Sequence, residues 1–347
     1  MEEGQPALSG PLVQLAWFSK PPEDGELNFL LEHFDIFILT KTDEPTRDYL
    51  REQGAAGPFL QYLRLDTIYN PGSCTEPPLR NQVADQVGDF CAISEQHPDW
   101  FLLDADGNRI FSQDNPEFVM MDPGNPGWRA FWLERARQNQ EEYDWDGVFA
   151  DNAEAGLGKR RLWGALPAAY PDDASYRSAI TGFLEYLYTS YFQPEGRLLQ
   201  ANIIALDDGG AWLEYLQYLD GAMDESFAMG WSDDYLSVVQ WEAEVSRAEE
   251  TQALGKHVVL VSQGDRDDAE RQTFAFASYL LASNGRASFR YADNEAYREV
   301  WLYSNYQLDL GAPLGPRYRA GSVWRRDFTQ GSISVDPVNK TAAIEQP

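Results

Sequence analysis

The stretch Trp145–Asn152, with the sequence WDGVFADN, is a short apolar strand core that runs directly into Asp151 and Asn152. Other short apolar runs of similar length recur along the chain, and stretches of helical periodicity lie between them. This alternation is typical of βα units arranged around a parallel sheet. No internal repeat or low-complexity segment interrupts the pattern.

Eight strands and several clear helices follow from this pattern. The predicted strands are Val13–Phe18, Phe34–Thr40, Phe59–Leu65, Gly147–Asp151, Leu198–Ala205, Gly221–Glu225, His257–Gln263 and Ala287–Tyr291. The clearest predicted helices are Trp128–Tyr143, Ser175–Phe192, Asp233–Leu254 and Asp268–Ser283. Eight strands with helices between them favour a closed barrel over an open sheet. We therefore expect an α/β fold in which residues 1–310 form a catalytic (β/α)8 TIM barrel.

A long insertion lies between the third and fourth predicted strands, from Asp66 to Asp146. Within it, Trp100–Phe111 predicts a β-hairpin because Asp106 and Gly107 are flanked by apolar residues. A connection of this length at the loop face of a barrel more often shapes a substrate cleft than serves packing. We therefore expect the insertion to border the binding site.

Residues 311–347 are predicted to form a short β-strand appendage. Gly311–Pro316 has the composition of a rigid linker, and Val323–Asp327 and Ser332–Val335 alternate like short strands around a turn at Gly331. Because so short a segment buries too little apolar surface to fold alone, we expect it to pack on the barrel.

The chain is strongly acidic. Its 347 residues include 56 Asp and Glu against 27 Lys and Arg, which gives a formal net charge of −29. Such a field repels phosphate backbones and anionic lipid, so we expect neither a nucleic acid nor a membrane as partner. No apolar run approaches the ~18 residues of a membrane span either. A neutral or cationic substrate remains compatible with this charge.

The two cysteines, Cys74 and Cys91, fit no zinc or redox spacing. They could form one disulfide that closes a loop in a secreted protein, or they could be two unrelated thiols. The first residues lack the basic start and apolar stretch of a signal peptide. We expect an extracellular or secreted location, with a cytoplasmic one as the open alternative.

Two of the predicted strands end in acidic residues, which is where catalytic residues of such barrels lie. Asp151 ends the strand at 147–151; a helix-capping Asp is the alternative, but no helical pattern begins there and a loop follows up to Asp172. The strand at 221–225 ends in Asp224 and Glu225. Neighbouring side chains of a strand point to opposite faces, and we prefer Glu225 as the residue nearer the strand end.

Two carboxyl groups are what the cleavage of an acetal needs. One protonates the leaving oxygen, and the other stabilises or attacks the oxocarbenium-like carbon. At the mouth of one barrel, Asp151 and Glu225 could converge at the ~5–5.5 Å of a retaining enzyme. The nucleophile should stay ionised among hydrogen-bond donors, whereas the acid should lie beside apolar rings such as Phe227 and Trp231.

Polar groups at other strand ends and several aromatic rings could contact a substrate. The candidate substrate-binding residues are Trp17, Tyr62, Asp66, Asp122, Asn152, Asn202, Trp231 and Gln263. The candidates for stacking on sugar rings are Trp17, Trp128, Trp163, Trp231 and several tyrosines, although most of the 11 Trp and 18 Tyr residues are expected to be packing residues. Asp122 lies in a turn rich in Pro and Gly, where Asp is common for turn reasons alone.

Metal and triad chemistry find no support in the sequence. The three histidines, His33, His97 and His257, form no HxH or HExxH spacing, and no GxSxG elbow or glycine-rich phosphate loop occurs. We therefore expect no metal and no other cofactor.

Five segments, in their order and spacing, resemble a known family. These are Phe34–Thr40, Met121–Pro126 (MDPGNP), Trp145–Asn152, Gly221–Phe227 and Leu310–Gly315 (LGAPLG). They are similar to the glycoside-hydrolase-like family 15 barrel proteins and, more distantly, to the endo-α-1,4-polygalactosaminidases of glycoside hydrolase family 114. The resemblance covers roughly Val13 to Val335.

This resemblance implies a retaining mechanism on α-linked sugars, with Asp151 as nucleophile and Glu225 as acid/base. The sequence departs from the relatives in the segment from Asn152 to Asp173 and in the long insertion, neither of which matches a substrate-defining pattern. Galactosaminide specificity is therefore not carried over.

The leading hypothesis is a retaining glycoside hydrolase that cleaves α-linked oligo- or polysaccharides. The alternative is a catalytically silent carbohydrate-binding barrel, which the presence of both acidic residues disfavours. A barrel lyase or metal hydrolase such as a phosphodiesterase is a third reading, which the scattered histidines disfavour.

Overall fold

A computed structural model describes residues 8, 10–23, 25–204, 210–231 and 234–346. Eight parallel strands form its main sheet, in the order β1-β2-β3-β6-β7-β8-β9-β10. They are β1 (Ala16–Phe18), β2 (Ile36–Leu39), β3 (Phe59–Arg64), β6 (Gly147–Glu154), β7 (Leu198–Ile204), β8 (Gly221–Asp224), β9 (His257–Gln263) and β10 (Ala287–Ala292). A parallel bridge between Leu15 and Phe289 links the first strand to the last. The fold is thus a nearly closed (β/α)8 barrel, as the sequence predicts.

Helices connect the strands, and a small sheet follows them. The helices are α1 (Leu27–His33), α2 (Glu44–Glu52), α3 (Asp89–Gln96), α4 (Pro126–Tyr143), α5 (Gly158–Trp163), α6 (Asp173–Leu187), α7 (Gly210–Leu216), α8 (Val238–Ala253) and α9 (Ala269–Ala282). The remaining strands are β4 (Thr67–Tyr69), β5 (Phe118–Met120), β11 (Tyr318–Ala320), β12 (Val323–Phe328), β13 (Gly331–Asp336) and β14 (Thr341–Glu345).

The strand and helix positions agree with the predicted ones to within a few residues, and the differences have local causes. The helix predicted from Asp233 begins at Val238, because Ser237 and Gln240 form a capping box there; Asp233 itself lies outside the described residues. The last residue of the predicted strand at 198–205 also lies outside them.

The loop expected after Asp151 is the main correction to the predicted elements. The strand β6 continues to Glu154, and the short helix α5 follows before α6. The predicted strand ends too early because polar residues replace the apolar run at Asp151. The helix α5 was not predicted because its six residues, half of them basic, are too few to show a helical period.

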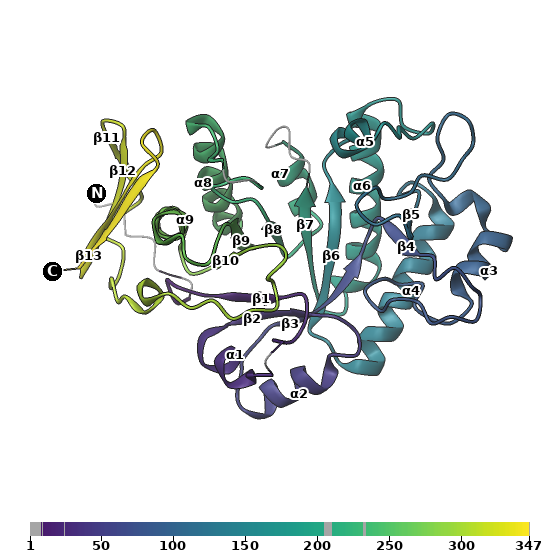
Figure 1. Cartoon of the computed structure of the whole chain (residues 1–347), viewed down its shortest axis with the longest axis horizontal. Coiled ribbons are helices and arrows are strands. Elements are labelled where there is room, and N and C mark those ends of the chain that lie inside the picture. The colour runs from purple at the N-terminus through teal and green to yellow at the C-terminus, as the bar shows by residue number, and fades with distance from the viewer. Residues whose placement is uncertain (1–7, 9, 24, 205–209, 232–233, 347) are drawn as a thin grey trace. The chain divides into compact units, whose positions relative to one another are not determined.

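By its internal contacts the chain divides into two compact units. One comprises Ile38–Tyr49 and Pro58–Ala222, and the other comprises Met1–Phe37, Leu50–Gly57 and Met223–Pro347. We call them the Asp151 unit and the Glu225 unit after the acid that each contains. In the Asp151 unit, β6 lies beside β7 with α6 against it (Figure 1).

The insertion of the Asp151 unit folds around the predicted hairpin. Asp104 N donates to Asn108 O and Ile110 N donates to Leu102 O, with Gly107 in the left-handed region between them. The hairpin prediction is therefore confirmed. Beside this hairpin, β4 and β5 pair antiparallel, so the insertion contains regular secondary structure.

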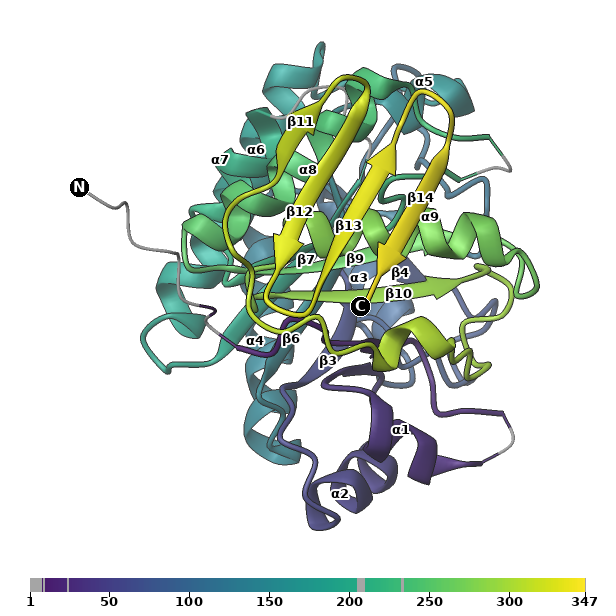
Figure 2. The same cartoon turned by 90° about the vertical axis from the view of Figure 1, so that its left-hand side faces the viewer.

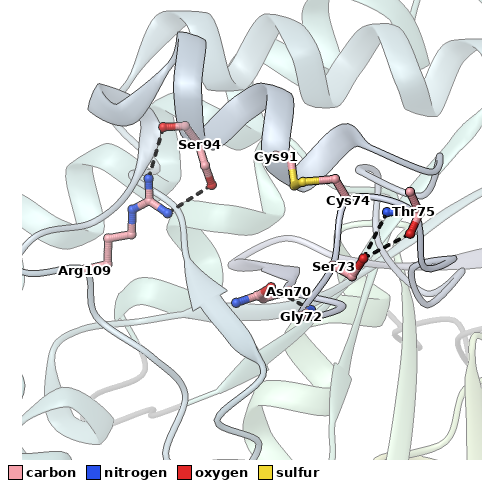
Figure 3. The surroundings of a disulfide bond; sticks show 8 residues. All are labelled: Asn70, Gly72, Ser73, Cys74, Thr75, Cys91, Ser94 and Arg109. Atoms are coloured by element: carbon pink, nitrogen blue, oxygen red, sulfur yellow. Dashed lines mark hydrogen bonds between the residues drawn. A yellow bond between two sulfur atoms is a disulfide. The ribbon is translucent and has the colours of Figure 1, made fainter.

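A disulfide joins Cys74 to Cys91, which settles the two alternatives that the sequence left open (Figure 3). Cys91 lies in the first turn of α3, and Cys74 lies in the loop that follows β4. The bond therefore fastens that loop to the helix inside the insertion.

The C-terminal sheet belongs to the Glu225 unit and packs on α9. Its four strands are antiparallel in the order β11-β12-β13-β14, and β13 and β14 lie against α9 (Figure 2). Arg326 of β12 is buried and donates to the carbonyls of Leu280, Leu281 and Ser283 at the end of that helix. These contacts satisfy carbonyls that the helix terminus leaves without intrahelical partners.

Candidate active site

The residue Asp151 lies in a β-bulge of β6. The pairing between β6 and β7 runs from Ala150–Ala201 to Ala153–Ile203, so two residues of β6 oppose one residue of β7. Asn152 takes a left-handed conformation there, with φ of 64°. A non-glycine residue with positive φ is uncommon, and bulges are frequent next to active sites because they redirect side chains.

Both carboxylate oxygens of Asp151 accept hydrogen bonds from neutral donors. Tyr62 Oη on β3 donates to Oδ2, and Asn202 Nδ2 on β7 donates to Oδ1 over 3.1 Å. The two hydrogen bonds fix the orientation of this carboxylate. The register that pairs Tyr62 with Phe149 and Arg64 with Asp151 brings these strand ends together.

A second acid, Asp66, lies beside this group. Asn152 Nδ2 donates to Asp66 Oδ1 over 3.4 Å, and Arg64 Nε lies 3.6 Å from the same oxygen. Burial alone would lower the pKa of Arg64, but Asp66, Tyr62 and Asp151 outweigh it and raise that pKa. Arg64 therefore stays a cation between acidic neighbours.

A buried ion pair supports the end of β6. Arg160 Nη2 of α5 lies 2.8 Å from Glu154 Oε1, and both side chains are fully buried. Tyr176 Oη donates to the other oxygen of Glu154 over 3.3 Å. Burial raises the pKa of Glu154, and Arg160 opposes that shift. The pair ties the segment that follows Asp151 to α5.

In the Glu225 unit, the two neighbouring acids at the end of β8 have different partners. Asp224 is buried, and its Oδ2 lies 3.1 Å from Arg247 Nη1 of α8. Glu225 instead accepts at Oε1 from Tyr297 Oη over 2.8 Å. Asp224 therefore forms a structural ion pair, whereas Glu225 follows the strand and bonds to a loop tyrosine.

A chain of hydrogen bonds orients this tyrosine. Gln263 Nε2 on β9 donates to Tyr297 Oη over 2.7 Å and lies 3.1 Å from the Glu225 carbonyl. Burial and the Glu225 carboxylate raise the pKa of Tyr297, which therefore remains a neutral donor. Arg290 Nη2 donates to the Tyr297 carbonyl over 2.6 Å.

Residues 77–332 match the sequence model of hypothetical glycosyl hydrolase family 15. The chain belongs to this family. No curated protein matches its sequence. Family membership and the barrel fold together support a glycosidase function and a carbohydrate substrate.

Several solved glycoside hydrolases have folds similar to that of this chain. The glycoside hydrolase domain of PelA from Pseudomonas aeruginosa is 18% identical with a TM-score of 0.54, covering 84% of this chain and 98% of that one. Aspergillus fumigatus Ega3, solved with galactosamine, is 13% identical with a TM-score of 0.50, covering 84% and 94%. The maltogenic α-amylase AmyB from Thermotoga neapolitana is 12% identical with a TM-score of 0.51, covering 94% and 86%.

The other predicted site residues differ in their burial and in their contacts. Trp17 is fully buried, with an edge-to-face contact to Phe34 and the Arg290 guanidinium over its ring, which corrects its proposed role as a sugar-stacking platform. Trp231 is 55% exposed and stays a stacking candidate. Asp122 Oδ1 accepts from Gly124 N and Tyr170 Oη, so it organises the MDPGNP turn.

An aromatic residue that was not predicted bonds to Glu225. The hydroxyl group that donates is that of Tyr297, whereas Phe227 is buried and its backbone N–H bonds to Val261 O. Tyr297 carries no signal in the sequence because it lies in an irregular segment without periodicity. Arg290 was not predicted either, although an arginine inside the apolar run ASFRYA of β10 is a detectable signal.

The part of the chain that the structure describes contains no group of three or more His, Cys, Asp or Glu side chains that could hold a metal ion. Within the same ranges, none of the helices has the length and apolar character that a membrane crossing requires.

Proposed function

We propose that this protein is a retaining α-glycosidase in which Asp151 is the nucleophile and Glu225 the acid/base. Its substrate is an α-linked oligo- or polysaccharide. The observation that carries the proposal is the pair of neutral donors, Tyr62 and Asn202, on the carboxylate of Asp151. A nucleophile must be held in the correct position for attack, and these two hydrogen bonds fix the orientation of the carboxylate.

The proposed acid/base is supported by its orientation. Because Tyr297 Oη accepts from Gln263 Nε2, its own proton is directed at Glu225 Oε1. A protonated carboxyl group that accepts at Oε1 carries its proton on Oε2. Catalytic residues of (β/α)8 barrels come from the carboxyl ends of several different strands, and a retaining reaction needs about 5–5.5 Å between its two carboxyl groups.

The reaction proceeds in two displacements. A carboxylate oxygen of Asp151 attacks the anomeric carbon, the glycosidic C–O bond breaks, and Glu225 gives its proton to the leaving oxygen. Glu225, now ionised, then takes a proton from water, whose oxygen attacks the same carbon and displaces Asp151. The released sugar keeps its anomeric configuration, and both acids return to their starting states.

The sugar is proposed only as a class. Ega3 was solved with galactosamine and AmyB is a maltogenic α-amylase, so α-linked galactosamine and glucose polymers are the first substrates to test. An acidic chain of net charge −29 suits a neutral or cationic glycan better than an anionic one.

The disulfide supports a secreted or extracellular location, because such bonds persist in oxidising compartments. We further propose that residues 1–310 form the catalytic barrel and that residues 311–347 form an appendage without a separate core. Arg326 and its contacts with α9 support this division.

The test is a product-resolved screen on α-linked polysaccharides and aryl α-glycosides. The wild type should release products that keep the α configuration, and Asp151→Ala and Glu225→Gln should each lower kcat by several orders of magnitude. Azide should restore turnover to Asp151→Ala and yield a β-glycosyl azide. Unchanged rates in either variant would refute that residue's role, and binding without turnover by the wild type would indicate a silent carbohydrate-binding protein.

A further inference from the structure

The insertion and the loop around α5 enclose a groove that the proposed reaction does not use. It consists of two adjoining hollows of about 360 Å³ and 500 Å³, which share Asp104 as a lining residue. Arg161 and Leu166 line the first hollow, and Arg109 and Phe111 line the second. We call this feature the wall groove.

The lining of the wall groove combines exposed apolar side chains with balanced charges. Phe111 is 44% exposed and Leu166 is 49% exposed, in a chain whose mean hydropathy is −0.49. The acidic Asp104 and Asp106 and the basic Arg109 and Arg161 lie around them. Sugar rings present apolar C–H faces and hydroxyl edges, so a surface with an aromatic ring and polar donors and acceptors suits them.

Hydrogen bonds between the two sides of the wall groove fix their relative positions. Ala168 N donates to Leu103 O over 2.9 Å, and Gln113 Nε2 donates to Trp163 O over 2.5 Å. An ion pair of 3.1 Å joins Lys159 to Asp114. A binding surface that is already ordered loses less conformational entropy when a ligand binds.

The disulfide supports one side of the groove. It holds α3, and Ser94 of that helix accepts from Arg109 Nη1 over 3.0 Å through its hydroxyl (Figure 3). The Ser94 carbonyl accepts from Arg109 Nη2 over 3.3 Å. Arg109 also covers the ring of Phe101, 3.7 Å from its centroid. These contacts fix the guanidinium group at the groove.

The segments that line the wall groove are connected along the chain to the strands around Asp151. The insertion starts at the end of β3, which carries Tyr62, and α5 follows the end of β6. Within this unit, Asn152 bonds to Asp66 of the insertion, and Glu154 pairs with Arg160, the neighbour of Arg161 on α5. Both sides of the groove are thus continuous with the strands that hold the proposed nucleophile.

We propose that the wall groove is a distal sugar-binding subsite that holds further units of the glycan cleaved at Asp151. This inference rests on the proposed glycosidase function. It names the substrate class more closely, as glycan chains long enough to reach the wall groove. It also assigns Phe111 and Leu166 as the residues that contact the distal sugars.

The experiment measures kcat/KM for an aryl α-glycoside and for short and long α-1,4-linked oligosaccharides of glucose and galactosamine. For the wild type, kcat/KM should increase with chain length. The double variant Phe111→Ser/Leu166→Asn should lose about tenfold on the long chains, equivalent to ~1.4 kcal/mol of binding. Its kcat/KM on the aryl glycoside should stay close to the wild-type value.

A matched control is Leu162→Asn, because Leu162 is 87% exposed on α5 and lines neither hollow. This control should behave as the wild type on every substrate. Equal losses of the double variant on long and short substrates, or a wild-type kcat/KM that is independent of chain length, would overturn the subsite.

A failure of the proposed function is distinguishable from a failure of the subsite. If the wild type cleaves no α-linked sugar, the catalytic proposal fails, and calorimetric titration with the same long oligosaccharides tests the groove alone. Weaker binding by the double variant than by Leu162→Asn supports the subsite, whereas equal binding or no binding overturns it.

Discussion

Replacement of Tyr297 by phenylalanine removes one oxygen and tests how the proposed acid is oriented. The lost contact is the 2.8 Å hydrogen bond from Tyr297 Oη to Glu225 Oε1, which Gln263 supports over 2.7 Å. Hydrogen bonds to charged groups contribute about 1.5–3 kcal/mol. A loss of this size from the protonation step corresponds to a decrease of about 10- to 150-fold in rate.

The leaving group decides whether this loss is seen. Hydrolysis of aryl α-glycosides with poor leaving groups, which need a proton, should slow by that factor in Tyr297→Phe. Substrates with dinitrophenyl leaving groups, which need none, should react nearly as fast as with the wild type. Because Tyr297 donates to the ionised carboxylate and stabilises it, its removal should also move the alkaline limb of the kcat/KM profile to higher pH.

The control for this prediction is Tyr318→Phe, which removes an exposed hydroxyl that bonds to Asp327 in the C-terminal sheet. It should change neither the leaving-group dependence nor the pH profile. If Tyr297→Phe slows good and poor leaving groups equally and leaves the alkaline limb in place, its role is structural and the orientation argument is wrong.

Three further predictions concern the two acids and their supports. Tyr62→Phe should lower kcat/KM by about 10- to 150-fold by removing a donor to the charged Asp151, and circular dichroism should show an intact fold; an unchanged rate contradicts the nucleophile's proposed environment. Arg160→Met should lower the free energy of unfolding, measured by chemical denaturation, by ~3–5 kcal/mol because it leaves Glu154 buried without its cation. A Glu154→Gln/Arg160→Met double variant should recover part of this loss. Equal stability of the wild type and both variants excludes a structural role for the pair. Burial lowers the pKa of His257 to about 4, below its ordinary value of 6.5. The stabilising contribution of the neutral imidazole is therefore complete above pH ~6.5 and is lost as the pH falls towards 4, by at most ~3 kcal/mol because the residue is only half-buried. The variant His257→Asn should flatten this part of the profile of stability against pH, and an identical profile refutes the shift.

Strand positions were predictable because each barrel strand carries its own local signal. The cores of two such strands, IFIL at 36–39 and VVLV at 258–261, are continuously apolar. A parallel strand that is covered on both faces carries such a run, so it can be recognised without knowledge of its neighbours in the sheet. The bulge in β6 was not predictable, because it depends on the pairing of Asp151 and Asn152 against β7. Short elements such as α5 carry too few residues for a period.

The site was predictable as a set of residue types and not as a set of contacts. Tyr62, Asp151 and Asn202 each stand near the end of a predicted strand, and only the strand register shows that they bond to one another. Tyr297 could not be found in this way, because it reaches Glu225 from a loop. Trp17 was chosen for its ring, and its burial follows from packing against β10 that the sequence does not encode locally.

The central claim is that Asp151 forms a covalent bond with the sugar during turnover. A 5-fluoro α-glycosyl fluoride of the sugar found in the substrate screen should trap this intermediate, and mass spectrometry of a digest should locate it. We expect one added sugar on the peptide that contains Asp151, and none in Asp151→Asn. A label on another carboxylate, or wild-type turnover that releases only the β anomer, would contradict the mechanism.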